Sequence, residues 1–159
     1  MKVIFLDIDG VLNTPSSESR CGEYIGIDDD KVERLKQIVE KTKAEIVLIS
    51  TWKKYWRKEE KLKPLQDYSA NYLDEKLAKQ GLKATDKTKD KSDGRYLSRG
   101  ESILEYVYRN NVEKYIILDD CQFDYDGCYL TDCLIKTKQA EGLTKAQAEN
   151  ACEILLKQL

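Results

Sequence analysis

Residues 2–13 read KVIFLDIDGVLN, an apolar run that ends in two carboxylates, Asp7 and Asp9, followed by Gly10. Four consecutive large apolar residues, Val3 to Leu6, are typical of a strand that is buried on both faces of a sheet. In an open parallel sheet, ligands bind at the carboxyl ends of the strands. Two acids at such an end are costly unless a cation compensates them. The stretch therefore predicts a cation and a reaction centre.

Three further segments repeat this plan, an apolar run that ends in polar residues. Glu45–Ile49 leads into Ser50-Thr51-Trp52, and Tyr115–Leu118 leads into Asp119-Asp120, whereas Leu134–Thr137 is more polar and suits an edge strand. Between these runs, apolar residues recur at helical spacing over residues 30–43, 101–111 and 144–158. The alternation predicts an α/β fold of three layers, Rossmann-like, with a parallel sheet flanked by helices.

Residues 53–97 differ in character from the rest. Helical pieces are expected over residues 56–62 and 69–80, and the polar stretch Lys83–Gly94 is expected to be a mobile, exposed loop. We expect residues 1–159 to form one domain, in which residues 53–97 make at most a small helical cap and a loop.

Composition excludes several function classes. The 159 residues carry a net charge of −2, so no overall basic field favours nonspecific nucleic-acid binding. The chain has no histidine, which excludes Ser-His-Asp and Cys-His catalysis and imidazole metal ligands. Five cysteines without a C-x-x-C spacing argue against a zinc site or a disulfide framework. With no signal peptide or membrane-length segment, these features predict a cytoplasmic protein with no membrane partner and no obligate protein partner.

The polar residues after the strands should converge, because parallel strands end at one edge of the sheet. A capping box, Ser98 to Glu101, places Arg99 in the first turn of a helix that enters between them. Several close carboxylates force one of them to hold a proton unless a cation neutralises them. With oxygen ligands and no imidazole, Mg²⁺ is the expected cation. Such an ion, a carboxylate nucleophile, a hydroxyl and a guanidinium together suit phosphoryl transfer through an aspartyl-phosphate.

The chain resembles the haloacid dehalogenase (HAD) superfamily of phosphohydrolases, because four motifs of that superfamily occur in it in the same order. They are Asp7-Ile8-Asp9-Gly10-Val11 after a buried strand, Ser50 after the second strand, Arg99 as the basic third motif, and Asp119-Asp120 followed by Asp124. In detail it is similar to a small-cap branch from bacterial, phage and RNA-repair proteins, which has D-G-V-L-N, S-x-W, R-G-x-x-I, I-L-D-D and a late G-L-T.

The resemblance implies a role for each motif residue. Asp7 would be the nucleophile, and Asp9 would protonate the leaving group and then activate water. Ser50 and Arg99 would hold the phosphoryl group. The metal ligands would be Asp7, Asp9 through its main-chain carbonyl, Asp119 and Asp120. Substrate contacts are expected from Gly10, Thr51, Trp52 and Lys53, where Lys53 stands at a position that is often arginine in this branch and offers a point charge instead of a fork.

The predicted activity is that of a Mg²⁺-dependent phosphomonoesterase whose partner is a phosphorylated substrate: a small molecule, a nucleotide or a nucleic-acid end. Two alternatives stay open, a receiver-like signalling domain and a catalytically silent HAD scaffold that binds phosphate or a partner. At the residue level, Trp52 and Trp56 either pack in the core or stack on a substrate. Asp124 is either part of the fourth motif or a loop acid.

Overall fold

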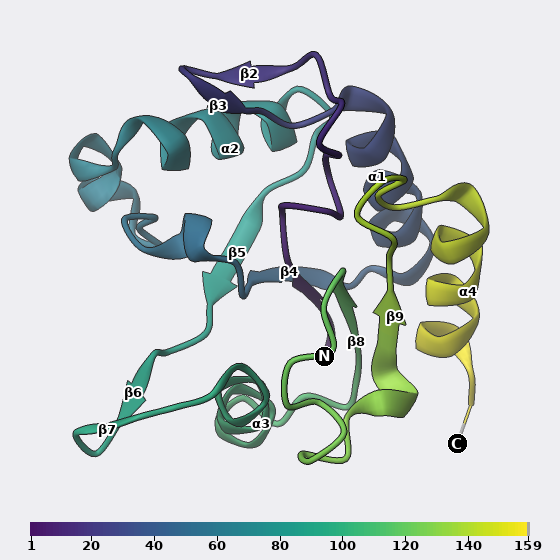
Figure 1. The fold of residues 1–159 in the computed structure, drawn as a ribbon. Helices are drawn as coiled ribbons and strands as arrows, with labels where there is room; N and C mark the ends of the chain where they lie inside the picture. The colour runs from purple at the N-terminus through teal and green to yellow at the C-terminus, as the bar shows by residue number, and fades with distance from the viewer. Residues whose placement is uncertain (159) are drawn as a thin grey trace.

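The computed structural model describes residues 1–158, and its centre is a parallel sheet of five strands. The spatial order is β5 (Ala84–Lys87), β4 (Glu45–Leu48), β1 (Lys2–Leu6), β8 (Lys114–Asp119) and β9 (Leu134–Lys136), as Figure 1 shows. Each adjacent pair is parallel. The predicted α/β class and the edge position of the strand at Leu134 are confirmed.

Helices cover both faces of this sheet. Helices α1 (Asp29–Thr42), α2 (Tyr68–Ala78) and α4 (Lys145–Leu156) contribute to the hydrophobic core on one face, and α3 (Arg99–Arg109) contributes to the core on the other (Figure 1). Strand β1 divides its side chains between the two, with Ile4 and Leu6 in the first core and Val3 and Phe5 in the second. A strand covered on both faces needs apolar residues at every position, which explains the unbroken run at the start of the chain.

Two hairpins and three 3₁₀ turns make up the remaining named elements of the described residues. The hairpins are antiparallel and pair β2 (Arg20–Cys21) with β3 (Tyr24–Ile25), and β6 (Lys91–Ser92) with β7 (Arg95–Tyr96). The 3₁₀ turns are η1 (Thr51–Lys53), η2 (Glu60–Leu65) and η3 (Thr131–Cys133). Within residues 1–158, no helix combines the length and apolar character that crossing a membrane requires.

The sheet order decides against the receiver-like alternative. Numbered along the chain, the five strands of the sheet lie in the order 3-2-1-4-5. A receiver domain has the flavodoxin-like order 2-1-3-4-5 instead. In the order found here, the direction of winding reverses between β1 and β8, so a crevice for ligands is expected at the carboxyl ends of these two strands. The first and fourth motifs follow these same two strands.

Two predictions for residues 53–97 are wrong. Within Lys83–Gly94, Ala84–Lys87 forms edge strand β5, paired with β4, and Lys91–Ser92 joins a hairpin. An edge strand has one neighbour and one exposed side, so it tolerates polar residues that read as a loop in sequence. The α-helix expected over residues 56–62 is absent: residues 56–59 are not helical, and the 3₁₀ turn η2 begins at Glu60. The later helix is confirmed as α2.

The late Gly-Leu-Thr segment holds the loop after β1. The backbone N–H of Leu143 donates to the carbonyl of Val11 at 2.8 Å. Gly142 has φ +66°, and a Cβ there would collide with Lys31 and the Val11 carbonyl. Glycine is required because the two loops approach so closely. Thr144 then caps α4 in a capping box, so one short segment ties the acidic loop to a helix.

Candidate active site

The carboxylates of Asp7 and Asp119 meet where β1 and β8 end. The Asp7 N–H donates to the Leu118 carbonyl at 2.9 Å, which extends the strand pairing by one residue. Asp119 is fully buried and Asp7 is 7% exposed. Two buried acids on neighbouring strands need nearby positive charge to remain ionised.

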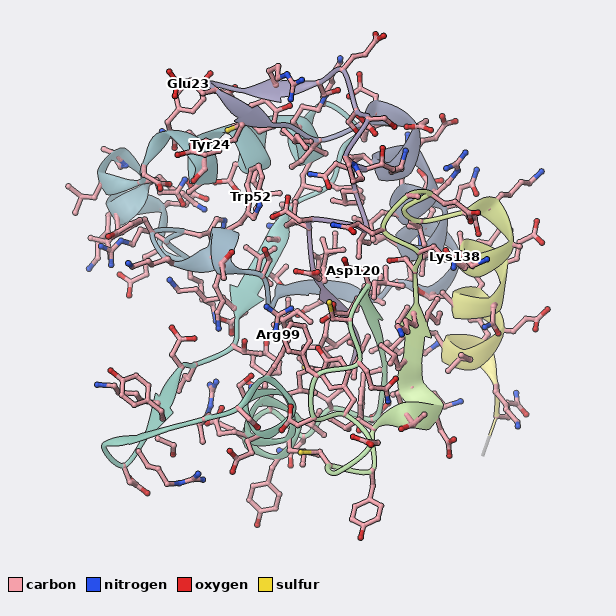
Figure 2. The ribbon with its side chains drawn as sticks, viewed as in Figure 1. Glu23, Tyr24, Trp52, Arg99, Asp120 and Lys138 are labelled. Carbon is pink, nitrogen blue, oxygen red and sulfur yellow. The ribbon has the colours of Figure 1, made fainter. Side chains whose placement is uncertain are left out.

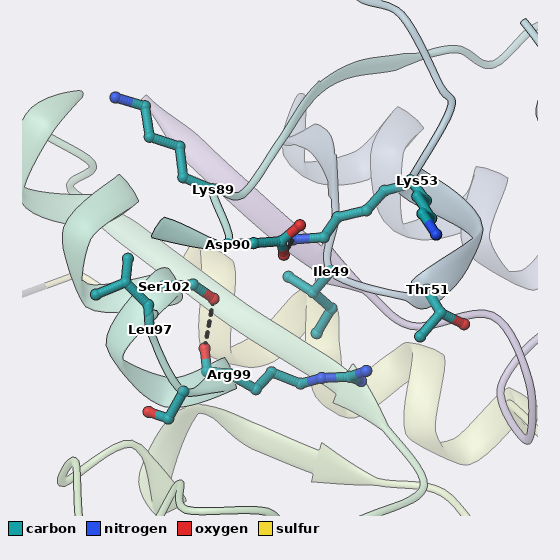
Figure 3. Close-up of a pocket in the computed structure, with 10 residues that line it drawn as sticks. Ile49, Thr51, Lys53, Lys89, Asp90, Leu97, Arg99 and Ser102 are labelled. Carbon is teal, nitrogen blue, oxygen red and sulfur yellow. Dashed lines mark hydrogen bonds and ion pairs between the residues drawn. The ribbon is translucent and has the colours of Figure 1, made fainter. Parts of the chain in front are cut away.

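Arg99 supplies that charge. Its Nη1 atom lies 3.0 Å from Asp119 Oδ2 and 3.4 Å from Asp7 Oδ1, so one guanidinium nitrogen contacts both acids. Figure 3 shows the Arg99 side chain in an extended conformation, reaching away from the helix that carries it. Burial alone would lower the pKa of Arg99, but the charges of Asp7 and Asp119 outweigh it and raise that pKa. Arg99, the third-motif residue, therefore contacts Asp7 of the first motif and Asp119 of the fourth.

Asp124 fixes the helix turn that carries Arg99. Its Oδ1 accepts from the backbone N–H of Gly100 at 2.9 Å, and its other oxygen accepts from the Ser98 hydroxyl. Ser98 also forms the predicted capping box with Glu101. A carboxylate at a helix N-terminus is favourable and offsets the cation that Arg99 puts there. Asp124 therefore anchors the N-terminus of α3.

Two aromatic residues around Arg99 and Asp119 were not anticipated from the sequence. The Tyr125 hydroxyl donates to Asp119 Oδ2 at 2.7 Å, and its ring is fully buried. The centroid of the Phe123 ring lies 4.1 Å from the guanidinium carbon of Arg99. The backbone of Phe123 has a positive φ of 45°. Both follow the Asp119-Asp120 pair closely in sequence, but nothing in a Phe-x-Tyr spacing indicates that the chain folds back over the strand end.

Asp9 lies on the exposed side of the site, and two donors orient it. Asn13 Nδ2 donates to one carboxylate oxygen at 2.9 Å, and the indole N–H of Trp52 donates to the other at 3.1 Å. Asn13 itself is held by accepting from the Gly10 N–H and donating to the Gly26 carbonyl. The Asn of the D-G-V-L-N motif is therefore a positioning residue that the sequence analysis did not assign.

Asp120 packs against the glycine of the first motif. Gly10 has φ +80°, and a Cβ there would collide with the Asp120 carboxylate. The Gly10 carbonyl accepts from the Thr137 hydroxyl at 2.6 Å, so the residue that follows β9 also fixes this turn. Because the Gly10 N–H is taken by Asn13, a substrate contact by Gly10 stays a prediction.

The residues after β4 lie beside these acids. Ser50 is buried at the end of the strand, and its hydroxyl accepts from the Trp52 N–H at 3.2 Å. Thr51 is exposed. The Lys53 ammonium is buried, donates to Thr88 and pairs with Asp90 at 2.9 Å. Burial lowers the pKa of Lys53, although Asp90 opposes this effect.

The two tryptophans have different environments. Trp56 is 1% exposed and belongs to the core, as the packing interpretation expects. Trp52 is half-buried, and its ring contacts Tyr72 at a centroid distance of 6.3 Å while its N–H binds Asp9. Trp52 and Asp9 line the same pocket, and stacking of Trp52 on a substrate stays a prediction.

The acids of the site repel one another. Burial, together with the charge of Asp119, raises the pKa of Asp7 to about 8, although Arg99 opposes this. Burial and Asp119 also raise the pKa of Asp120. A divalent cation would relieve this repulsion. Ligand atoms of Asp119, Asp120 and Cys121 lie within 4.8 Å of one another. The pKa of the Cys121 thiol is raised by burial and then by Asp120, so the available donors are carboxylate oxygens, which suit Mg²⁺.

Two pockets flank this cluster. The hairpin pocket, of about 560 Å³, lies between the β2–β3 hairpin and the start of η1, and it is lined by Asp9, Arg20, Tyr24, Ile25, Trp52 and Ser69 among others. The basic pocket, of about 290 Å³, lies between η1, the β6–β7 region and α3, and its lining includes Lys53, Lys54, Lys89, Asp90, Arg99 and Ser102 (Figure 3). Thr51 lines both, so the two pockets meet at the start of η1.

Comparison with protein families identifies the chain. Residues 3–148 match the family described as the HAD domain in Swiss Army Knife RNA repair proteins. The chain belongs to this HAD family. The expected resemblance to the RNA-repair branch is confirmed, and the parallel sheet flanked by helices is the Rossmann-like core of the superfamily. Comparison with curated proteins gave no match.

Proposed function

We propose that this HAD domain is a Mg²⁺-dependent phosphomonoesterase that acts on nucleotide or polynucleotide phosphate ends through an aspartyl-phosphate intermediate. The observation that carries the proposal is the contact of one Arg99 nitrogen with both Asp7 and Asp119 at the β1–β8 strand ends. The membership in a family of RNA-repair domains supports a nucleic-acid end as the substrate class.

The first half-reaction needs a nucleophile and an acid. In this proposal a carboxylate oxygen of Asp7 attacks phosphorus, the bond from phosphorus to the leaving oxygen breaks, and Asp9 gives that oxygen a proton. Asp9 suits this role because it is exposed and its orientation is fixed by Asn13 and Trp52. Arg99 and Ser50 would bind the phosphoryl oxygens while negative charge builds on them.

The second half-reaction returns the enzyme to its starting state. Asp9, now ionised, removes a proton from a water molecule that attacks phosphorus, and the bond to Asp7 breaks to release inorganic phosphate. Mg²⁺ bound by Asp7, Asp119 and Asp120 would neutralise charge on the phosphoryl group. Tyr125 and Arg99 hold the Asp119 carboxylate in place for this purpose by donating to it.

A substrate panel tests the proposal. Release of inorganic phosphate is measured from p-nitrophenyl phosphate, nucleoside monophosphates and oligonucleotides with 3′- or 5′-phosphate ends, with Mg²⁺ and with a chelator. We expect Mg²⁺-dependent release that falls at least about 10³-fold in Asp7→Asn, the loss typical of a missing nucleophile. Asp93→Asn is the matched control, because Asp93 is an exposed acid in the β6–β7 turn at φ +51°, which asparagine tolerates.

The outcomes separate an enzyme from a silent scaffold. Turnover in the wild type and in Asp93→Asn but not in Asp7→Asn supports the proposed activity. If the wild-type protein releases no phosphate from any compound in the panel with Mg²⁺ present, the proposal fails, and the catalytically silent alternative takes its place.

A further inference from the structure

The hairpin pocket stands on the side of the site from which the leaving group must depart. Asp9, the proposed proton donor to the leaving oxygen, lines this pocket. A group within hydrogen-bond reach of Asp9 therefore extends into the hairpin pocket. The lining of this pocket then sets which leaving groups fit, and this step rests on the proposed function.

The lining of the pocket favours a planar, uncharged group. One wall contains Trp52, and the β2–β3 hairpin contributes Tyr24, whose side chain is 77% exposed. Figure 2 shows Tyr24 on the hairpin, on the same side of the site as Trp52 and away from Arg99. The charged residues of this lining are two acids, Asp9 and Glu23, and one cation, Arg20. The excess of negative charge disfavours a second phosphate in the pocket but does not disfavour an aromatic ring.

Trp52 is already held in one orientation before any substrate binds. Its indole N–H is fixed by Asp9, and its ring contacts Tyr72. Tyr72 is fixed in turn, because its hydroxyl accepts from the Ile27 N–H at 3.0 Å. A platform that is fixed in advance loses little conformational entropy when a ring stacks on it. Exposed Tyr24 contributes a second aromatic ring to the same pocket.

We propose that the hairpin pocket binds the nucleoside of the substrate, with the base stacked on Trp52 and contacted by Tyr24. The pocket would thereby select a nucleotide end over a phosphate ester that lacks a base. The phosphoryl group stays with Arg99 and Ser50, on the other side of Asp9. Stacking selects a base by its flat face, so all bases are expected to be accepted.

The kinetic test compares two nucleotides with a sugar phosphate that lacks the base, and adenosine 5′-monophosphate and ribose 5-phosphate are the pair matched in the position of the phosphate. Values of kcat/KM are measured for adenosine 3′- and 5′-monophosphate and for ribose 5-phosphate in the wild type and in Tyr24→Ala. We expect the wild type to prefer a nucleotide, and the preference to fall about tenfold in Tyr24→Ala, the factor that corresponds to losing one aromatic stacking partner. Tyr108→Ala is the matched control, because Tyr108 is 89% exposed on α3, away from this pocket, and its removal should preserve the preference.

A binding test gives the same answer without turnover. In Asp7→Asn, the nucleotides should quench indole fluorescence through Trp52, whereas ribose 5-phosphate should not, and Trp52→Phe in the same background should abolish the quenching. Equal kcat/KM for nucleotide and ribose 5-phosphate in the wild type, or an unchanged preference in Tyr24→Ala, overturns the inference and leaves the phosphatase proposal intact. If no substrate is turned over, the phosphatase proposal fails, and the absence of nucleotide quenching would overturn the pocket assignment too.

Discussion

The hairpin pocket and the basic pocket share Thr51 but differ in chemistry. The hairpin pocket holds Asp9 with the aromatic rings of Tyr24 and Trp52, whereas the basic pocket gathers Lys53, Lys54, Lys89 and Arg99 around one acid, Asp90. This difference in chemistry indicates that each pocket binds a different part of the substrate at one reaction centre. Positive charge belongs where phosphoryl oxygens are held, and aromatic surface belongs where an organic leaving group rests. Variants on either side of the centre should therefore respond differently to substrates with and without a base.

Removing Arg99 should damage the phosphoryl side most. Because Arg99 contacts both Asp7 and Asp119, Arg99→Ala should lower kcat/KM by about 10²–10³-fold for every substrate, with or without a base. Arg99→Lys should recover only part of this, since an ammonium is a point charge and lacks the planar fork. Steady-state kinetics on nucleotide and ribose phosphates measure both variants. A loss confined to nucleotides would contradict the division between the pockets.

Replacing Trp52 by phenylalanine should separate its two roles. The variant keeps an aromatic face but loses the donor to Asp9. We expect kcat to fall about tenfold, because one orienting hydrogen bond contributes roughly 1–1.5 kcal/mol. The KM for nucleotides should change little. If KM rises while kcat stays constant, Trp52 acts through substrate binding alone and does not position Asp9.

Asp124→Asn should weaken the anchor at the N-terminus of α3, and the resulting loss of stability should depend on pH. Burial works to raise the pKa of Asp124, but the hydrogen bonds from Ser98 and Gly100 outweigh it, so the pKa is lowered in the folded state. An acid of this kind stabilises the fold above its ordinary pKa, and this contribution disappears as the pH falls through the lowered value. Urea unfolding should show a loss of about 1 kcal/mol at pH 7.

The same measurement at lower pH provides the control for Asp124. As the pH falls below about 4, the Asp124 carboxyl group takes up a proton first in the unfolded chain and then, at its lowered pKa, in the folded protein. The stabilities of the wild type and Asp124→Asn should therefore approach each other over this range. A difference that is independent of pH would show that shape, and not charge, holds the helix terminus.

Lys89→Ala should have the smallest effect. Lys89 lines the basic pocket with a half-exposed side chain, 3.9 Å from Glu105. Its removal should lower kcat/KM for an oligonucleotide end about two- to threefold at low ionic strength, and the effect should vanish in high salt. Lys138→Ala serves as the control, because this exposed lysine lies beyond β9, away from Arg99 in Figure 2. Equal effects of the two changes would mean that the basic pocket does not attract substrate.

The chemistry of the strand ends was predictable from the sequence. Val3 to Leu6 and Ile116 to Leu118 are apolar because both faces of their strands are covered, and the acids that follow are conspicuous for that reason. The capping box at Ser98 likewise indicates where α3 begins and so where Arg99 lies. Strand β5 escaped prediction because its polar residues, among them Thr85, Asp86 and Lys87, reflect its place at an edge that only the pairing with β4 creates.

Local features could be predicted from the sequence: the buried strands, the helix starts, and the identity of the acids, the hydroxyl and the guanidinium. These depend on periodicity and on capping within a few residues. The contacts between distant segments required the three-dimensional fold: Tyr125 donates to Asp119, Trp52 and Asn13 orient Asp9, and Tyr24 shares a pocket with Trp52. Each of these contacts depends on where a loop returns in space, and the path of a loop is fixed by packing between distant segments and not by the residues that it carries.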